Sequence, residues 1–207
     1  AGLPDNFKIT TFTPDLFEVD SSDVVVAATI LKSTLEAAIV TISDARAGFN
    51  STSTSPLIVN ATITNPFPKY GSAIITFPSD YDLTGAYVEW HNMPGSVSVA
   101  VNVGTNSINV TRRTSASDDD VTEGSTISME FSGIRNPVIT GPIGKFELSL
   151  KTRLGHITDE DDAIEGLGNI VAGLLTSFTI EPDSLVAGET DRDFVVGVKL
   201  ANPLPID

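Results

Sequence analysis

Two stretches of this chain, beginning at Leu57 and at Phe194, share one pattern. Residues 57–68 read Leu-Ile-Val-Asn-Ala-Thr-Ile-Thr-Asn-Pro-Phe-Pro, and residues 194–205 read Phe-Val-Val-Gly-Val-Lys-Leu-Ala-Asn-Pro-Leu-Pro. In both, alternating apolar residues lead into Asn-Pro-x-Pro, which is the period-two pattern of a half-buried strand. The prolines end the strand because they cannot donate to a ladder. The recurrence predicts a chain built from repeated β units.

Other segments recur in the same order at a similar spacing. The matched segments are 2–10 with 141–149, 20–23 with 159–162, 37–42 with 174–180 (with a one-residue slip), and 47–48 with 187–188. Matches at a near-constant offset indicate tandem repeats. We therefore interpret residues 1–48 as the terminal part of a preceding repeat, 49–188 as a complete β-sandwich repeat, and 189–207 as the first strand of a following repeat.

The complete unit is predicted to be all-β. Seven segments alternate or are bounded by turn residues, at 57–64, 72–77, 86–90, 97–103, 107–111, 126–131 and 145–151. Short strands at this spacing, separated by Gly, Pro and Asn, predict an Ig-like antiparallel β-sandwich. Residues 24–39 and 163–176 are compatible with a helix or with strand–turn–strand. The valines at 24–26 and the glycines at 166, 168 and 173 favour strand–turn–strand.

Composition excludes several classes of function. The 207 residues carry a net charge of −15 and include no cysteine. Such an acidic surface repels phosphate backbones and anionic lipid, so we expect no nucleic-acid partner and no membrane insertion. No apolar run reaches the roughly 18 residues of a membrane span. Because the chain begins at Ala1, we expect upstream residues to have been removed or to lie outside this sequence.

Three N-glycosylation sequons are present, at Asn50, Asn60 and Asn109. Asn60 and Asn109 fall on the phase of their strands opposite the apolar residues, and a glycan needs such an outward, solvated position. We therefore expect N-linked glycans at these asparagines if the chain is secreted by a eukaryotic cell. The alternative is three bare surface asparagines.

No catalytic motif is found, and we predict that the chain is not an enzyme. Acidic clusters at Asp118–Asp120 and Asp159–Asp162 could bind calcium, although a solvated acidic turn is the simpler interpretation. His91 and His156 lie in no nucleophile or metal motif. Trp90, with the tyrosines at 87 and 81, could stack on sugars, but aromatic packing in the core is the commoner role. No other cofactor is expected.

The stretch Asn65–Pro78, Asn-Pro-Phe-Pro-Lys-Tyr-Gly-Ser-Ala-Ile-Ile-Thr-Phe-Pro, resembles a phrase of the form NPLP-Gly-I-x-I-x-FP. That phrase recurs in tandem Ig-like β-sandwich repeats of large extracellular, fibrous proteins of microbial eukaryotes. Residues 127–137 and 141–152 are similar to the closing strands of such a repeat. The resemblance covers roughly residues 49–188, and Lys69-Tyr70 departs from the glycine-rich turn typical of it. It implies a cell-surface or fibrous structural protein and brings no catalytic residues.

Residues 1–48 and 189–207 carry strand patterns whose partners are missing from the chain. Unpaired strands of this kind pair with a neighbour by β-strand addition. The predicted assembly strand consists of Phe194, Val196, Val198, Leu200, Asn202 and Pro203. The predicted partners are copies of the chain or adjacent repeats, head to tail, because a contact of that kind that does not close yields a filament.

We therefore expect a structural protein of an extracellular, glycosylated filament or surface coat. An adhesin-like module that recognises glycan or another surface is the alternative. A carbohydrate-active enzyme is the weakest of the three readings, because no paired-carboxylate site can be located.

Overall fold

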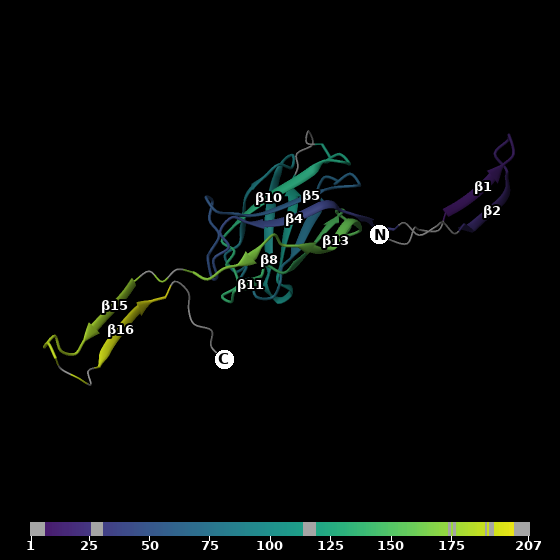
Figure 1. The fold of residues 1–207 in the computed structure, drawn as a ribbon. Coiled ribbons are helices and arrows are strands. Elements are labelled where there is room, and N and C mark those ends of the chain that lie inside the picture. The colour runs from purple at the N-terminus through teal and green to yellow at the C-terminus, as the bar shows by residue number, and fades with distance from the viewer. Residues whose placement is uncertain are drawn as a thin grey trace.

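The computed structural model describes residues 7–25, 31–113, 119–173, 175, 177–188, 190 and 193–200. These residues form strands throughout, apart from loops and one 3₁₀ turn at Val103–Thr105. Two sheets pack face to face in a central β-sandwich, and one β-hairpin projects from it on each side (Figure 1). The predicted all-β, Ig-like antiparallel sandwich is confirmed.

The first sheet has four antiparallel strands in the order β4-β5-β10-β7. Their bounds are β4 Glu36–Ile42, β5 Leu57–Thr62, β10 Thr126–Ser132 and β7 Tyr87–His91. Along β5, buried and half-buried residues alternate, with Leu57, Val59 and Ala61 facing the core. The alternation is the physical reason why this segment forms a strand with one inner face.

The second sheet has six strands in the order β3-β13-β12-β6-β9-β8. Their bounds are β3 Ser33–Thr34, β13 Ile157–Glu165, β12 Lys145–Lys151, β6 Ser72–Thr76, β9 Ser107–Arg113 and β8 Ser96–Asn102. All neighbours are antiparallel except the short pair β3 and β13. A separate two-stranded antiparallel ladder pairs β11 (Gly141–Pro142), which precedes β12 in the sequence, with β14 (Asn169–Ile170), which follows β13.

All seven predicted strands are present, as β5 to β10 and β12, with ends shifted by at most two residues. The described parts of 24–39 and 163–176 contain strands and no helix, as strand–turn–strand requires. The strands β3 and β4 lie in the segment 1–48, yet they pair with β13 and β5 of the sandwich. The division into repeat units at residues 48 and 188 stays a prediction.

In the described part of the chain, the core between the sheets is largely apolar and includes the buried cation of Arg112. Phe77, Tyr81 and Phe146 form an aromatic cluster with ring centroids 5.4–5.9 Å apart, in which Phe146 packs edge to face with the other two rings. The Arg112 side chain is fully buried, with its guanidinium 5.5 Å from the centroid of the Phe67 ring. That guanidinium donates to the carbonyl oxygens of Phe67 (2.7 Å), Asp119 (2.8 Å) and Pro94 (3.3 Å). A buried charge held by carbonyl dipoles in this way ties three loops to one point.

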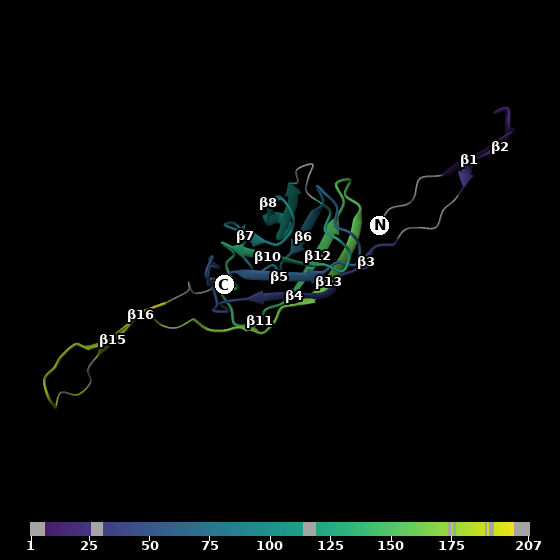
Figure 2. The same ribbon diagram turned by 90° about the horizontal axis from the view of Figure 1, so that it is seen from above.

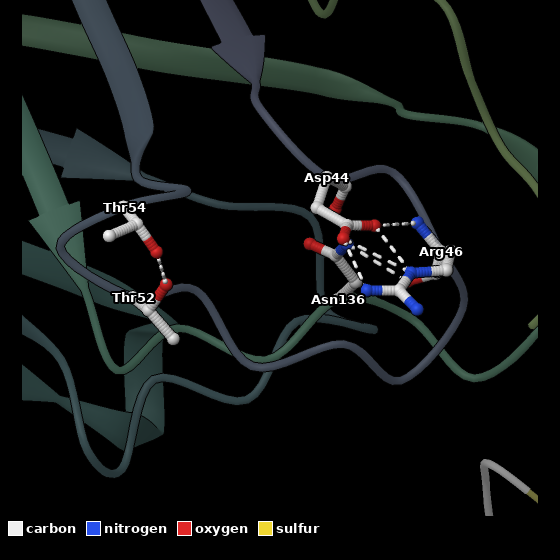
Figure 3. A network of polar contacts seen from close by, with 5 residues as sticks. All are labelled: Asp44, Arg46, Thr52, Thr54 and Asn136. Atoms are coloured by element: carbon white, nitrogen blue, oxygen red, sulfur yellow. Dashed lines mark hydrogen bonds and ion pairs between the residues drawn. The ribbon is translucent and has the colours of Figure 1, made fainter.

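At one end of the sandwich, Asn136 joins two loops (Figure 3). Its buried side-chain amide donates to the carbonyl oxygens of Asp44 (2.8 Å) and Arg46 (3.0 Å). The Arg46 guanidinium also donates to the Asp44 carboxylate, and this hydrogen bond lowers the pKa of Asp44. The loop between β4 and β5 is thereby fixed to the loop after β10.

The two projecting hairpins are β1 (Phe7–Phe12) with β2 (Glu18–Val25), and β15 (Ser177–Pro182) with β16 (Phe194–Lys199). The expectation that the terminal strands lack partners in the chain was therefore wrong for the described strands, because β1 pairs with β2 and β16 pairs with β15. Both views show the hairpins on opposite sides of the sandwich (Figures 1 and 2). No helix among the described residues is long and apolar enough to cross a membrane.

Candidate interaction site

The C-terminal hairpin exposes a row of large apolar side chains. In β16, Phe194, Val196 and Val198 are 62%, 55% and 41% exposed, and Leu200 follows at 44%. These are four of the six residues predicted to form an assembly strand; Asn202 and Pro203 lie outside the described residues. The opposing strand β15 adds the exposed side chains of Phe178 and Ile180.

This hairpin repeats the β4–β5 pair of the sandwich in its register. Val40 of β4 lies opposite Val59 of β5, and Ile180 of β15 lies opposite Val196 of β16. Ile42 and Leu57 are matched in the same way by Pro182 and Phe194. The bond that closes each pair is also repeated: Ser43 N donates to Pro56 O at 3.2 Å, and Asp183 N donates to Asp193 O at 3.1 Å.

The pairing corrects one detail of the sequence match. The one-residue slip aligned Ile42 with Ile180, whereas the register places Val40 at that position. The register agrees with the match of Ala47-Gly48 to Ala187-Gly188. Ladder partners fix the alignment because slipping a strand by one residue would exchange its two faces.

The counterparts of the exposed row are core residues. Leu57, Val59 and Ala61 hold the register positions of Phe194, Val196 and Val198, and each is at most 1% exposed. Ile63, at the position of Leu200, is fully buried. The face of β15–β16 is thus an inner sandwich face without an opposing sheet.

The N-terminal hairpin β1–β2 repeats a different pair of the sandwich, β12–β13. Phe7 opposite Val25 corresponds to Phe146 opposite Ile164, and Thr11 opposite Asp20 corresponds to Leu150 opposite Asp159. The register shifts of the two ladders also fall at equivalent places. In β1 they lie between Phe7 and Ile9 and between Thr11 and Phe12, and in β12 they lie between Phe146 and Leu148 and between Leu150 and Lys151.

The turns of these two hairpins also match. Thr13 N donates to Phe17 O at 2.8 Å, and Thr152 N donates to His156 O at 2.9 Å. In each turn the threonine hydroxyl accepts the return bond, from Phe17 N at 3.1 Å and from His156 N at 3.2 Å. The two hairpins therefore share a backbone design, which includes a left-handed residue at Leu16 and at Gly155.

Within the sandwich, β4–β5 and β12–β13 lie in opposite sheets and share one core. Leu167 N, just after β13, donates to Val40 O of β4 at 3.1 Å, and Gly166 forms a bridge with Val40. The pairs β4–β5 and β12–β13 are therefore joined along one side of the sandwich as well as through the core.

Asp159 connects the same two hairpins by polar contacts. Its fully buried carboxylate accepts hydrogen bonds from Thr64 Oγ1 (2.5 Å), Asn65 Nδ2 (3.0 Å) and Asn65 N (3.3 Å). Asn65 is the first residue of the Asn-Pro-Phe-Pro motif that follows β5. The motif thus ends the strand with its prolines and uses its asparagine to engage the opposite sheet.

The interpretation of residues 159–162 as a solvated acidic turn was wrong, whereas calcium binding at these residues is not tested by the structure. These residues lie in the middle of β13, where alternation sends successive carboxylates to opposite faces. Asp159 points inward to Thr64 and Asn65, and Glu160 forms an ion pair with Lys32. Sequence reasoning missed Asp159 as an anchor, although its offset from Asp20 and the repeated Asn-Pro were visible signals.

The other acidic cluster contains Asp119 and Asp120; Asp118 lies outside the described residues. Asp120 Oδ1 accepts a hydrogen bond from Lys69 N at 2.8 Å. In the described part of the chain, no three His, Cys, Asp or Glu side chains are grouped so that they could hold a metal ion.

The three sequon asparagines lie at accessible positions. Asn60 and Asn109 are half-buried on the outer faces of β5 and β9, between buried neighbours. Asn50 is exposed in the loop between β4 and β5. The Thr111 hydroxyl of the third sequon donates to Asn109 Oδ1 at 3.3 Å. Glycosylation at these asparagines stays a prediction.

The histidines and aromatic residues separate into core and surface. Tyr81 is buried, its hydroxyl donates to Ile143 O at 3.2 Å, and burial raises the pKa of that phenol. Burial likewise lowers the pKa of His91. His156 is exposed in the turn after β12. Tyr87 and Trp90, by contrast, are half exposed on β7, so the expectation of core packing is correct for Tyr81 alone.

No protein-family model and no curated protein matches the chain. Among solved structures, it is similar to a non-cellulosomal cohesin from the hyperthermophilic archaeon Archaeoglobus fulgidus. The identity is 11% and the TM-score 0.31, over 67% of this chain and 93% of the cohesin chain. At that TM-score no property of the cohesin is transferred to this protein.

Proposed function

We propose that this chain is a structural subunit or repeat of an extracellular, glycosylated filament or surface coat, assembled head to tail by β-strand complementation. The observation that carries the proposal is the hairpin β15–β16. It has the register of β4–β5, but the row that is buried in β4–β5 is exposed in it. An exposed apolar row of this size on a hairpin is an association surface.

Three further observations support the proposal. The two hairpins lie on opposite sides of the sandwich, so they do not contact each other within one chain (Figure 2). Each is therefore available to the unlike hairpin of another copy, which is a head-to-tail contact. The resemblance of residues 65–78 to tandem extracellular repeats agrees with a structural role. Asn60 and Asn109 lie on the outer faces of β5 and β9, which belong to opposite sheets of the sandwich and not to the projecting hairpins.

Electron microscopy of the full chain secreted from a eukaryotic host tests the proposal. We expect filaments whose length increases with protein concentration. Because the net charge is −15, we expect assembly at about 0.15 M salt, where screening shortens the repulsion to roughly 8 Å, and weaker assembly at low salt. A chain that stays monomeric in sedimentation at every salt and protein concentration would refute the function.

A matched pair of substitutions locates the surface. Val196→Asp places a charge in the exposed row, whereas Val195→Asp places it at the position of Ile58, on the outer face of the counterpart pair. We expect Val196→Asp to abolish filaments and Val195→Asp to retain them. Equal effects of the two would show that the row is not the contact.

The mass of the intact secreted chain tests the glycan part of the proposal. We expect added hexose-containing mass that falls stepwise in Asn60→Gln and Asn109→Gln. An unmodified mass in the parent chain would remove glycosylation from the proposed function while leaving assembly untouched.

One observation favours the adhesin-like alternative. A bulge in β7 brings Tyr87 opposite Ser132 and Trp90 opposite Glu130, which are two residues apart on β10. Tyr87 and Trp90 therefore share one face of the sheet at its edge and are both about half exposed. Aromatic pairs of this kind can stack on sugar rings. A glycan array with the parent chain and with Trp90→Ala tests this function, and a blank array would exclude it for the glycans displayed.

A further inference from the structure

We propose that the C-terminal hairpin β15–β16 of one copy docks face to face on the N-terminal hairpin β1–β2 of a second copy. This inference rests on the proposed head-to-tail assembly and names the surface that each end supplies. The sandwich itself is the template, because it contains both hairpin types already packed against each other.

The first step is the assignment of each end to a layer. The hairpin β15–β16 has the register of β4–β5, and β1–β2 has the register of β12–β13. In the sandwich these two pairs belong to opposite sheets and contribute to one core. The tail of the chain is therefore one half of a facing pair, and its head is the other half.

The second step excludes pairing within one copy. The two hairpins lie on opposite sides of the sandwich in both views (Figures 1 and 2). The complementary face must then come from another molecule. Every copy has one hairpin of each type, so each bound copy presents a free hairpin to a further copy, and the assembly stays open where the rotation between copies does not close a ring.

The third step concerns the positions that would meet. Phe7, Ile9 and Val25 hold the register positions of Phe146, Leu148 and Ile164, all of which are buried in the sandwich. On the other hairpin, the exposed row of β16 and Leu200 holds the positions of the buried row of β5. Both faces of the proposed contact thus have apolar counterparts that meet in the same structure.

The polar anchor of the sandwich also has a counterpart at this contact. Asp20 holds the register position of Asp159 and is exposed in β2. Asp159 receives its hydrogen bonds from Thr64 and Asn65, directly after Ile63. Leu200 holds the position of Ile63, so docking brings the Asp20 region of one copy beside the Leu200 region of the other.

The contact reproduces two hairpins of a sandwich and not the strands between them. Nothing equivalent to β6, β9 or β10 is supplied by either hairpin. We therefore expect an association that is reversible on dilution, unlike the folding of the sandwich itself.

Single-cysteine variants test the geometry cleanly, because the natural chain has no cysteine. Asp20→Cys and Leu200→Cys are prepared separately, mixed as full-length chains, and treated with a short bismaleimide. Ser21→Cys and Lys199→Cys are the matched controls, because each is the adjacent residue on the opposite phase of the same hairpin. All four substitutions lie outside the sandwich, and circular dichroism checks that each chain folds.

The expected result is a covalent dimer of doubled mass from the mixture of Asp20→Cys and Leu200→Cys, with a yield several-fold above that of the control mixture. Peptide mapping should join the segment of residue 20 to that of residue 200. Efficient cross-linking of Leu200→Cys to itself, or a yield from the test mixture no higher than that from the control mixture, would overturn the inference.

Sedimentation of the same mixtures separates this inference from the function on which it rests. Assembly without the expected cross-link would overturn hairpin-on-hairpin docking and leave the filament proposal intact. Absence of any association at concentrations where the chain is folded would overturn both.

Discussion

Replacing Asp159 by alanine should destabilise the sandwich, whereas the same change at its counterpart Asp20 should not. Asp159 is fully buried and accepts three hydrogen bonds from Thr64 and Asn65. Asp20 holds the same register position in β2, opposite Thr11, as Asp159 holds in β13, opposite Leu150. Unlike Asp159, Asp20 is exposed. The pair compares one residue type at one register position, with and without an opposing sheet.

The magnitude follows from what each donor can do once the carboxylate is gone. The Thr64 hydroxyl can turn to Thr34 O, which lies 3.1 Å away, and the Asn65 side chain has Thr158 O at 3.4 Å. The half-buried Asn65 N–H keeps no partner of this kind, which costs about 1–3 kcal/mol. The space left by the removed carboxylate adds roughly 1 kcal/mol. We expect a loss of about 2–4 kcal/mol for Asp159→Ala and less than about 0.5 kcal/mol for Asp20→Ala.

Urea unfolding followed by the fluorescence of Trp90, the single tryptophan, measures both values. The experiment is done at low protein concentration so that association does not add to the apparent stability. The midpoint should shift in Asp159→Ala with an unchanged m value. If the two variants shift the midpoint equally, the carboxylate is not the anchor between the sheets.

Three further predictions concern the sandwich. Arg112→Leu leaves the carbonyl oxygens around its guanidinium unpaired and should cost about 3–5 kcal/mol in urea unfolding, with Arg112→Lys recovering part of the loss; an effect below 1 kcal/mol would contradict this cage. Gly133→Ala puts a Cβ against the Gly85 carbonyl at φ +77°, whereas in Gly124→Ala, at φ +76°, the Cβ meets nothing within 4 Å. Gly124→Ala should lower the free energy of unfolding by the roughly 1–2 kcal/mol of backbone strain alone, and Gly133→Ala should lower it by clearly more. Equal losses in urea unfolding would show that the contact with Gly85 is irrelevant. Because burial lowers the pKa of His91 below its usual 6.5, the folded state binds fewer protons than the unfolded state as the pH falls through that value; the free energy of unfolding should therefore decrease below about pH 6.5, and His91→Gln should flatten this slope if the reasoning is right.

The strands of this protein could be predicted from the sequence because their pattern is local. Val59 and Ala61 alternate with Ile58 and Asn60, and a period of two is sufficient to assign both the strand and its inner face. The same alternation placed Asn60 and Asn109 outward, and the structure has them on the outer faces, half-buried between fully buried neighbours.

Residues whose role depends on a distant segment could not be assigned in this way. Trp90 and Tyr87 share a face only because of a bulge against β10, which no local pattern announces. The acidic run at 159–162 has the composition of a solvated turn, and its place in a central strand depends on pairing with β12. Arg112 is buried only because carbonyl groups of three separate loops meet around it.

The sequence by itself determined an all-β chain and a recurring strand pattern that ends in Asn-Pro-x-Pro, since both follow from periodicity along one dimension. The sequence also matched the head of the chain with the β12–β13 segments and its tail with the β4–β5 segments. Only the tertiary structure decided that these two pairs are the facing halves of one sandwich and fixed their register. Register and facing are relations between segments far apart in the sequence. They are set by ladder hydrogen bonds and a shared core, and a lone strand pattern contains neither.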